Sequence, residues 1–192
     1  DKGYDFDQNR WCRMIDRRQF LSFATAAVAT SLFAAPAIAR PSIRKPERSI
    51  SFYNIHTGES ANGVYWAEGR YDRRALSSIY RVLRDHRTDQ VHAIDVDVID
   101  LLHRLRSRVG LSRPFHVISG YRSPESNAML ASMSDGVASH SLHMQGKAVD
   151  IRVEHMSPVT LGRTAKSLKG GGVGIYRSSN FVHVDCGKVR TW

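Results

Sequence analysis

The stretch that decides the fold is Ser141-Leu142-His143-Met144-Gln145-Gly146-Lys147-Ala148-Val149-Asp150-Ile151. Its second half is a short apolar run typical of a buried β-strand, and its first half carries a histidine and a glycine suited to a turn. Strand alternation places Val149 and Ile151 on one face and Asp150 on the other. A carboxylate amid this apolar surface needs a partner, because burying an unpaired charge is costly. A metal ion is one such partner.

A second group of polar residues lies in the run Phe181-Val182-His183-Val184-Asp185. The period of two places the first, third and fifth residues of this run on one strand face. Together His143, His183 and Asp150 offer two imidazoles and one carboxylate, the ligand set of catalytic zinc, in which a fourth position stays open. Spacing alone also fits a structural role for His143 in a turn and Asp150 in a cap or ion pair, because the chain has nine histidines.

Signals for helices and strands surround these two runs. The apolar spacing predicts one amphipathic helix from Asp72 to Leu83 and a second from Asp95 to Val109 with Gly110 as its stop. The pairs Ser123-Pro124 and Ser157-Pro158 each predict an N-cap followed by proline, opening helices that run to Met133 and to Gly170-Gly171-Gly172. Strands are expected over 51–55, 115–119, 147–153, 173–176 and 181–185, with Gly58 and Gly63 in the turn after the first and residues 177–180 in a hairpin. This order predicts an α+β domain with a small, mainly antiparallel sheet covered by helices.

The N-terminal residues carry the signals of an export leader. Arg17-Arg18-Gln19-Phe20-Leu21 precedes an alanine-rich apolar stretch that ends in Ala37-Ile38-Ala39. A basic region, an apolar region and an A-x-A site define a secretory signal, and the paired arginines fit the twin-arginine (Tat) route. An uncleaved membrane anchor is the alternative, since the apolar stretch approaches the length of a spanning helix. The expected organisation is additional N-terminal sequence over 1–13, a twin-arginine signal peptide over 14–39, a linker over 40–50 and the folded domain over 51–192.

The composition excludes disordered, collagen-like and disulfide-stapled chains, because 192 residues include 42% hydrophobic residues and two cysteines. Without residues 1–39 the net charge falls from +10 to +9, since five basic and four acidic residues leave. A basic exported domain is expected to meet an anionic partner, although a solvated basic surface also fits. Nucleic acid ranks last, because the arginines are scattered and form no known reading motif. Cys186, the remaining cysteine, is expected in the core rather than as a nucleophile.

Four segments together resemble one family of enzymes. They are Ser119-Gly120-Tyr121-Arg122-Ser123-Pro124, residues 141–151, Gly171-Gly172-Val173-Gly174-Ile175-Tyr176 and residues 181–185. The family is the D-Ala-D-Ala carboxypeptidase-like zinc peptidases of the lysostaphin, D-Ala-D-Ala peptidase and hedgehog fold group. Within it the chain is most similar to periplasmic murein endopeptidases of the MepK type. The resemblance spans roughly residues 49–192, and its S-x-H-x-x-G-x-A-x-D pattern is specific. The closing Val189-Arg190-Thr191-Trp192 and the twin-arginine leader also resemble this subgroup.

This resemblance implies a zinc peptidase domain over 51–192 that holds one Zn²⁺ ion with water as its fourth ligand. The zinc ligands that it implies are His143, Asp150 and His183. It also implies that Arg122 binds substrate or stabilises the developing oxyanion, and that Tyr121 and Ser141 contact the peptide. These roles agree with physical chemistry, because zinc activates water and polarises a carbonyl, and a guanidinium stabilises charge that forms in the transition state.

The general base is left open by the resemblance. Many relatives carry Glu or His two or three positions before the last ligand, where this chain has Phe181 and Asn180. Asp185 is the first candidate because it shares a strand face with His183, but orienting that histidine is an equal alternative. Further candidates are His140 and Glu154.

The function expected from the sequence is hydrolysis of peptide cross-links in peptidoglycan by a zinc-dependent murein endopeptidase. The protein is expected to reach the periplasm by the Tat route and to act as a monomer, with peptidoglycan as partner, without nucleic acid and without stable membrane insertion after cleavage. A D,D- or L,D-carboxypeptidase acting on stem peptides is a second possibility. A peptidoglycan-binding module that retains the metal without catalysis is a third. The type of cross-link stays open.

Overall fold

The structure is a computed structural model that describes residues 46–133 and 138–192. The predicted leader over 14–39 and the additional sequence over 1–13 lie outside the described residues. Within the described part of the chain, no helix is both long and apolar enough to span a membrane.

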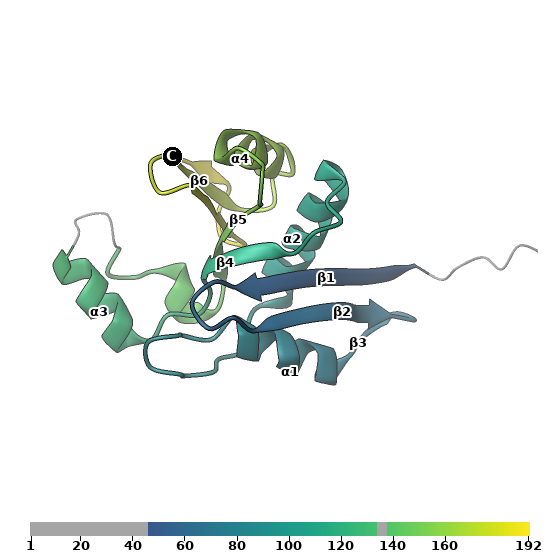
Figure 1. Cartoon of the computed structure of the whole chain (residues 1–192), viewed down its shortest axis with the longest axis horizontal. Helices are drawn as coiled ribbons and strands as arrows, with labels where there is room; N and C mark the ends of the chain where they lie inside the picture. The colour runs from purple at the N-terminus through teal and green to yellow at the C-terminus, as the bar shows by residue number, and fades with distance from the viewer. Residues whose placement is uncertain (1–45, 134–137) are drawn as a thin grey trace, which may run out of the picture. The chain divides into compact units, whose positions relative to one another are not determined.

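A single sheet of eight strands is present in the described residues, in the order β3-β2-β1-β4-β5-β7-β6-β8 (Figure 1). The strands are β1 (Glu47–Asn54), β2 (Ser60–Ala67), β3 (Arg70–Tyr71), β4 (Phe115–Ser119), β5 (Ala148–Arg152), β6 (Gly172–Tyr176), β7 (Phe181–Asp185) and β8 (Arg190–Thr191). The pairs β1–β4 and β6–β8 are parallel. The sheet is therefore mixed, and the prediction of a mainly antiparallel sheet is wrong.

The two parallel pairs have a topological cause. Two helices follow the hairpin region after β1 and return the chain to the same end of the sheet, so β4 enters beside β1 in the same direction. Such a crossover is the usual way to join parallel strands. At the other end, β7 reverses the chain after β6, and the last segment reverses it again, so that β8 runs parallel to β6.

In the part of the chain that the structure describes, four α-helices form where the sequence predicts them. They are α1 (Arg73–Val82), α2 (Val96–Val109), α3 (Pro124–Met133) and α4 (Pro158–Ser167). The side chain of Asp72 accepts hydrogen bonds from the first turn of α1, and Asp95 and Ser157 cap α2 and α4 in the same way. Gly110 ends α2 in the left-handed conformation, at a φ of 64°.

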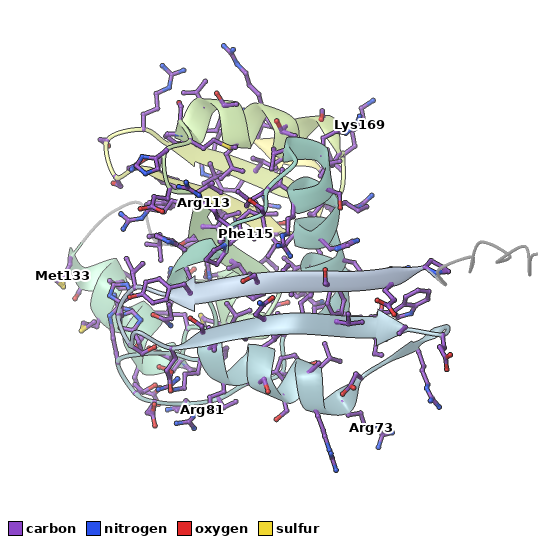
Figure 2. All side chains as sticks on the ribbon, turned by 45° about the vertical axis from the view of Figure 1, so that its right-hand side comes forward. Arg73, Arg81, Arg113, Phe115, Met133 and Lys169 are labelled. Carbon is purple, nitrogen blue, oxygen red and sulfur yellow. The ribbon has the colours of Figure 1, made fainter. Side chains whose placement is uncertain are left out.

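The core lies between the sheet and three of these helices. Helix α1 contacts β1 and β2, α2 contacts β1 and β7, and α4 contacts β6 and β7, whereas α3 projects away from them (Figure 1). Figure 2 shows Phe115 inside the body and Arg73 and Arg81 extending from α1. Phe115 is fully buried and packs beside Phe52. Val149 and Ile151 of β5 belong to the same core, so Asp150 faces the other side.

Several strands differ from the expected ones. Strand β1 begins at Glu47, inside the stretch 40–50 expected to be a linker. Strand β2 is not expected from the sequence, because Gly63 suggests a turn there. In the structure Gly63 lies inside the strand and pairs with Ile50 of β1. The two-residue strands β3 and β8 are too short to leave a periodic signal, and they were missed for that reason.

Candidate metal centre

Two of the predicted ligands are direct neighbours in the sheet. Asp150 of β5 is the ladder partner of His183 of β7, so their side chains leave the same face side by side. Both are largely buried, with 6% and 9% of their surface exposed. The face that carries them is the one opposite the apolar core residues of β5.

The third predicted ligand, His143, comes from a short 3₁₀ helix, η1 (Leu142–Gln145), that precedes β5. The hydroxyl of Ser141 accepts a hydrogen bond from the backbone N–H of His143 and caps this helix, and Gly146 ends it with a φ of 65°. The ring Nδ1 of His143 lies 2.8 Å from the carbonyl oxygen of Gly120. A carbonyl can only accept, so Nδ1 carries the proton and Nε2 keeps its lone pair.

The three side chains converge on one point. Asp150 Oδ1 lies 2.8 Å from His183 Nδ1 and 3.3 Å from His143 Nε2, and the two nitrogens are 3.2 Å apart. The candidate ligand atoms of all three residues lie within 4.8 Å of one another. Two imidazole nitrogens and a carboxylate oxygen that meet in this way suit a divalent metal ion, because each can offer a lone pair to it. The residues present therefore fit a metal.

Asp185 holds His183 from the opposite side. The ring Nε2 of His183 lies 3.0 Å from Asp185 Oδ2 and donates to it, which leaves Nδ1 free to face Asp150. Asp185 is fully buried, and it also accepts hydrogen bonds from the backbone N–H groups of Gly172 and Gly187, at 3.0 and 2.8 Å. The guanidinium of Arg190 adds two more, at 3.2 and 2.8 Å.

The charges of the group support one another in the metal-free protein. Burial alone would raise the pKa of Asp150, but the hydrogen bonds and charges of His143 and His183 outweigh it and hold that pKa below its usual range. Burial would lower the pKa of His183, whereas hydrogen bonds to Asp150 and Asp185 raise it to about 9. Asp150 is therefore an anion, ready to bind a cation.

A cavity of about 370 Å³ opens over the three candidate ligands. Besides the ligands, the residues that line it include Arg122, His140, Ser141, Tyr176, Phe181 and Trp192. A pocket with converging polar groups and perturbed titratable residues is the expected form of an active site.

Comparison with known proteins identifies the family of the chain. A family model described as peptidoglycan L,D-endopeptidase MepK matches residues 42–192. The chain belongs to this family. A probable peptidoglycan L,D-endopeptidase MepK of Haemophilus influenzae is 38% identical over 178 residues, which are 92% of this chain and 95% of the relative. The peptidoglycan L,D-endopeptidase MepK of Escherichia coli K12 is 36% identical over 177 residues, 92% of this chain and 97% of the relative.

In this member of the MepK family, Arg122 lines the cavity beside the candidate ligands. Its Nη2 lies 3.9 Å from Asp150 Oδ2, and its Nη1 donates to the side chain of Asn127 at 3.3 Å. Among the described residues, the buried Nε of Arg122 has no hydrogen-bond partner. Burial lowers the pKa of Arg122, although a guanidinium stays charged at any pH a protein tolerates. A guanidinium that lines the cavity beside the candidate ligands is suited to bind an oxygen of a substrate.

The structure brings together most, but not all, of the sequence-predicted site residues. His140 and Ser141 line the cavity with Arg122. Tyr121 does not, because its ring stacks on His92 at 4.5 Å. Glu154 lies in a separate cavity and pairs with Arg113.

Tyr176 and Trp192 are among the lining residues that the sequence did not predict. Tyr176 shares a strand face with Gly174, the ladder partner of His183, so the period of two in β6 could have placed Tyr176 beside the site. Trp192 belongs to a closing segment that resembles the family, but no periodic pattern places it at the site. The strand before it, β8, is only two residues long.

Proposed function

We propose that this protein is a zinc-dependent peptidoglycan L,D-endopeptidase that hydrolyses peptide cross-links of the cell wall. The observation that carries the proposal is the meeting of His143 Nε2, His183 Nδ1 and Asp150 Oδ1 beneath a cavity. Membership of the MepK family supports the choice of peptidoglycan as substrate. A set of two histidines and one carboxylate favours zinc over harder or softer ions.

Zinc, when bound, supplies Lewis acidity and an activated water molecule. The chain's own contribution begins with the tautomers of its two histidines. The carbonyl of Gly120 holds the proton of His143 on Nδ1, and Asp185 holds the proton of His183 on Nε2. His143 thereby presents its unprotonated Nε2 to the centre, whereas the raised pKa of His183 means that its Nδ1 must give up a proton before it can bind a metal ion.

Arg122 is proposed to bind the carbonyl oxygen of the scissile peptide. Its guanidinium lines the cavity beside the candidate ligands, with Nη2 3.9 Å from Asp150 Oδ2. Negative charge develops on that oxygen in the transition state, so a preorganised cation lowers the barrier more than it strengthens ground-state binding. Ser141, which lines the same cavity, is proposed to contact the peptide backbone.

Asp185 is proposed to position His183 rather than to act as the general base. Both of its oxygens already accept hydrogen bonds, and the side chain is fully buried behind the ring. A base must reach the attacking water. His140 is exposed and lines the cavity, which supports it as the proton acceptor.

Export is proposed for the same protein. Its substrate lies outside the cytoplasm, and residues 14–39 have the pattern of a twin-arginine signal. The basic charge of the remaining chain favours residence near an anionic wall. We also propose that the protein acts as a monomer, with residues 51–192 as the peptidase domain.

Chromatography of muropeptides tests the proposed reaction. Purified protein with one equivalent of zinc should convert cross-linked muropeptide dimers into monomers. Release of terminal D-alanine without loss of dimers would favour a carboxypeptidase instead. If neither product forms but the protein sediments with sacculi, the binding module is the correct alternative and the proposed activity is wrong.

A further inference from the structure

The C-terminal tail adds two side chains to the site in an unusual way. Strand β8 runs beside β6, with Arg190 opposite Gly172. Two positions further along the tail, Trp192 lies opposite Gly174. Its backbone N–H donates to the carbonyl of Val173, and its own carbonyl accepts from the N–H of Ile175. Arg190 and Trp192 therefore share the sheet face on which the metal ligands lie.

One row across the sheet now contains Asp150, His183, Gly174 and Trp192, from β5 through β7 and β6 to the tail. Glycine leaves its position in the row bare. The indole of Trp192 lies over it and reaches the ring of His183, at 5.2 Å between centroids. A methyl group at Gly174 would come 2.6 Å from the indole, so the bare position is what admits the tryptophan.

In the neighbouring row across the sheet, a glycine of β6 again leaves space for a side chain of the tail. Arg190 reaches over Gly172 to the buried carboxylate of Asp185, to which it donates at 2.8 Å. Its guanidinium also lies 5.0 Å from the centroid of Trp192. The contact with Arg190 and the backbone hydrogen bonds of Trp192 hold the indole in place. Ligand binding therefore costs little further loss of side-chain entropy at Trp192.

Trp192 in turn fixes Tyr176. The indole Nε1–H donates to the Tyr176 hydroxyl at 2.9 Å, and the Tyr176 ring stacks on Phe181 at 4.4 Å. Because the hydroxyl accepts from Trp192, its own proton is free to be donated elsewhere. Both residues line the cavity over the metal ligands, and 49% of the surface of Trp192 remains exposed.

We propose that Trp192 and Tyr176 form a substrate subsite beside the metal centre, in which the indole contacts an alkyl segment of the cross-linked peptide and the Tyr176 hydroxyl donates to one of its carbonyl groups. The inference rests on the proposed peptidase function. A cross-link between two stem peptides contains the alkyl chain of a diamino acid flanked by amide groups. An exposed, rigidly held aromatic wall with one hydrogen-bond donor matches that combination.

Steady-state kinetics on muropeptide dimers with Trp192→Ala tests the subsite. The variant should raise KM about tenfold or more, as expected for loss of a central aromatic contact. Trp192→Phe should fall between Ala and the parent, and Tyr176→Phe should cost about fivefold in kcat/KM, the value of one hydrogen bond. Zinc content should equal that of the parent in all three, because the ligands and their partners remain. Trp66→Ala, which removes an indole from β2, is the matched control with unchanged KM.

Gly174→Ala provides an independent variant, since its methyl group displaces the indole without removing it. It should raise KM as Trp192→Ala does. Adding Gly174→Ala to Trp192→Ala should change KM no further, because the two substitutions act on one contact. A thermal unfolding midpoint close to that of Trp192→Ala in the double variant shows that the methyl group is accommodated once the indole is gone.

Binding can also be followed without turnover. In the full chain, Trp11→Phe with Trp66→Phe leaves Trp192 as the single tryptophan of three. After zinc is removed with a chelator, titration with muropeptide dimers should change its emission in a saturable way. Unchanged emission, an unchanged KM in Trp192→Ala, or loss of zinc from that variant would each overturn the subsite. If the parent itself cleaves no dimers, the proposed function fails and the subsite fails with it. If the parent cleaves dimers and Trp192→Ala has the same KM as the parent, only the subsite is refuted.

Discussion

At the scale of single residues, the site depends on which atom of each histidine carries a proton. His143 is fixed by a backbone carbonyl and His183 by a buried carboxylate. The sequence could single out His143, Asp150 and His183 as candidate ligands, because they lie in recognisable motifs. It could not predict the role of Gly120, since a backbone carbonyl leaves no signal in the residue type. The resemblance implies that Tyr121 contacts the peptide, whereas its ring stacks on His92 and it is not among the residues that line the cavity.

His143→Ala should abolish retention of zinc. The substitution removes one of three protein ligands, and the remaining pair cannot complete a tetrahedral site. Elemental analysis after dialysis should show about one zinc per chain in the parent and almost none in the variant. His155→Ala is the matched control, because His155 is an exposed histidine that faces Glu154. Zinc content unchanged by His143→Ala would refute the ligand assignment.

A histidine outside the site should make stability depend on pH. Burial, followed by the charges of His56 and Arg87, lowers the pKa of His86 to about 4, although Asp85 opposes this shift. The ring stacks on His56 at 3.9 Å. Between pH 6.5 and about 4 the unfolded chain therefore binds a proton that the folded chain does not bind. Stability from this group is present above pH 6.5 and is lost as the pH falls through about 4.

The measurement is the free energy of unfolding in denaturant at several pH values. Between pH 6.5 and 4, the parent should lose stability more steeply than His86→Gln, which cannot be protonated. His155→Gln should follow the parent. Parallel curves for the parent and His86→Gln would show that His86 is not the responsible group.

At the scale of elements, local signals in the sequence were sufficient wherever a helix is capped by its own neighbours. Asp72, Asp95 and the Ser-Pro pairs mark helix starts through bonds to the next few residues, and these predictions are confirmed. Strand β2 was missed because its pairing with β1, rather than its own residue pattern, makes it a strand. Gly63 in its middle suggested the opposite.

The junction after β4 offers a test at this scale. Gly120 lies against the carbonyl oxygen of Leu83, with which a methyl group would collide. The neighbouring N–H of Tyr121 donates to that same carbonyl at 2.7 Å, so the two segments cannot separate freely. Gly120→Ala should therefore destabilise the fold by about 1–3 kcal/mol, as overpacked sites do.

Denaturant unfolding of Gly120→Ala measures this cost directly. Ser77→Ala, on the exposed face of α1, is the control and should stay within about 0.5 kcal/mol of the parent. A stability of Gly120→Ala equal to that of the control would mean that Leu83 and Gly120 do not approach as closely as described. The variant should also hold zinc more weakly, because the Gly120 carbonyl orients His143.

At the scale of the whole domain, an α+β class was predictable, but the order of strands was not. The alternation of helices and strands gives the class, whereas the pairing of β1 with β4 joins residues that are about sixty positions apart. No local sequence pattern in β1 or β4 predicts that the two strands pair. The candidate metal centre depends on that order, because β5 lies between β4 and β7 and so brings Asp150 next to His183 and Gly120 near His143.

The central claim is that residues from η1, β5 and β7 hold one divalent ion on which hydrolysis of peptidoglycan cross-links depends. Restoration of activity by zinc tests this most directly: muropeptide dimers are incubated with chelator-treated protein, before and after one equivalent of zinc, and separated by chromatography. Dimers should persist without zinc and become monomers with it. Equal loss of dimers in both samples, or no loss in either, would contradict a metal-dependent endopeptidase.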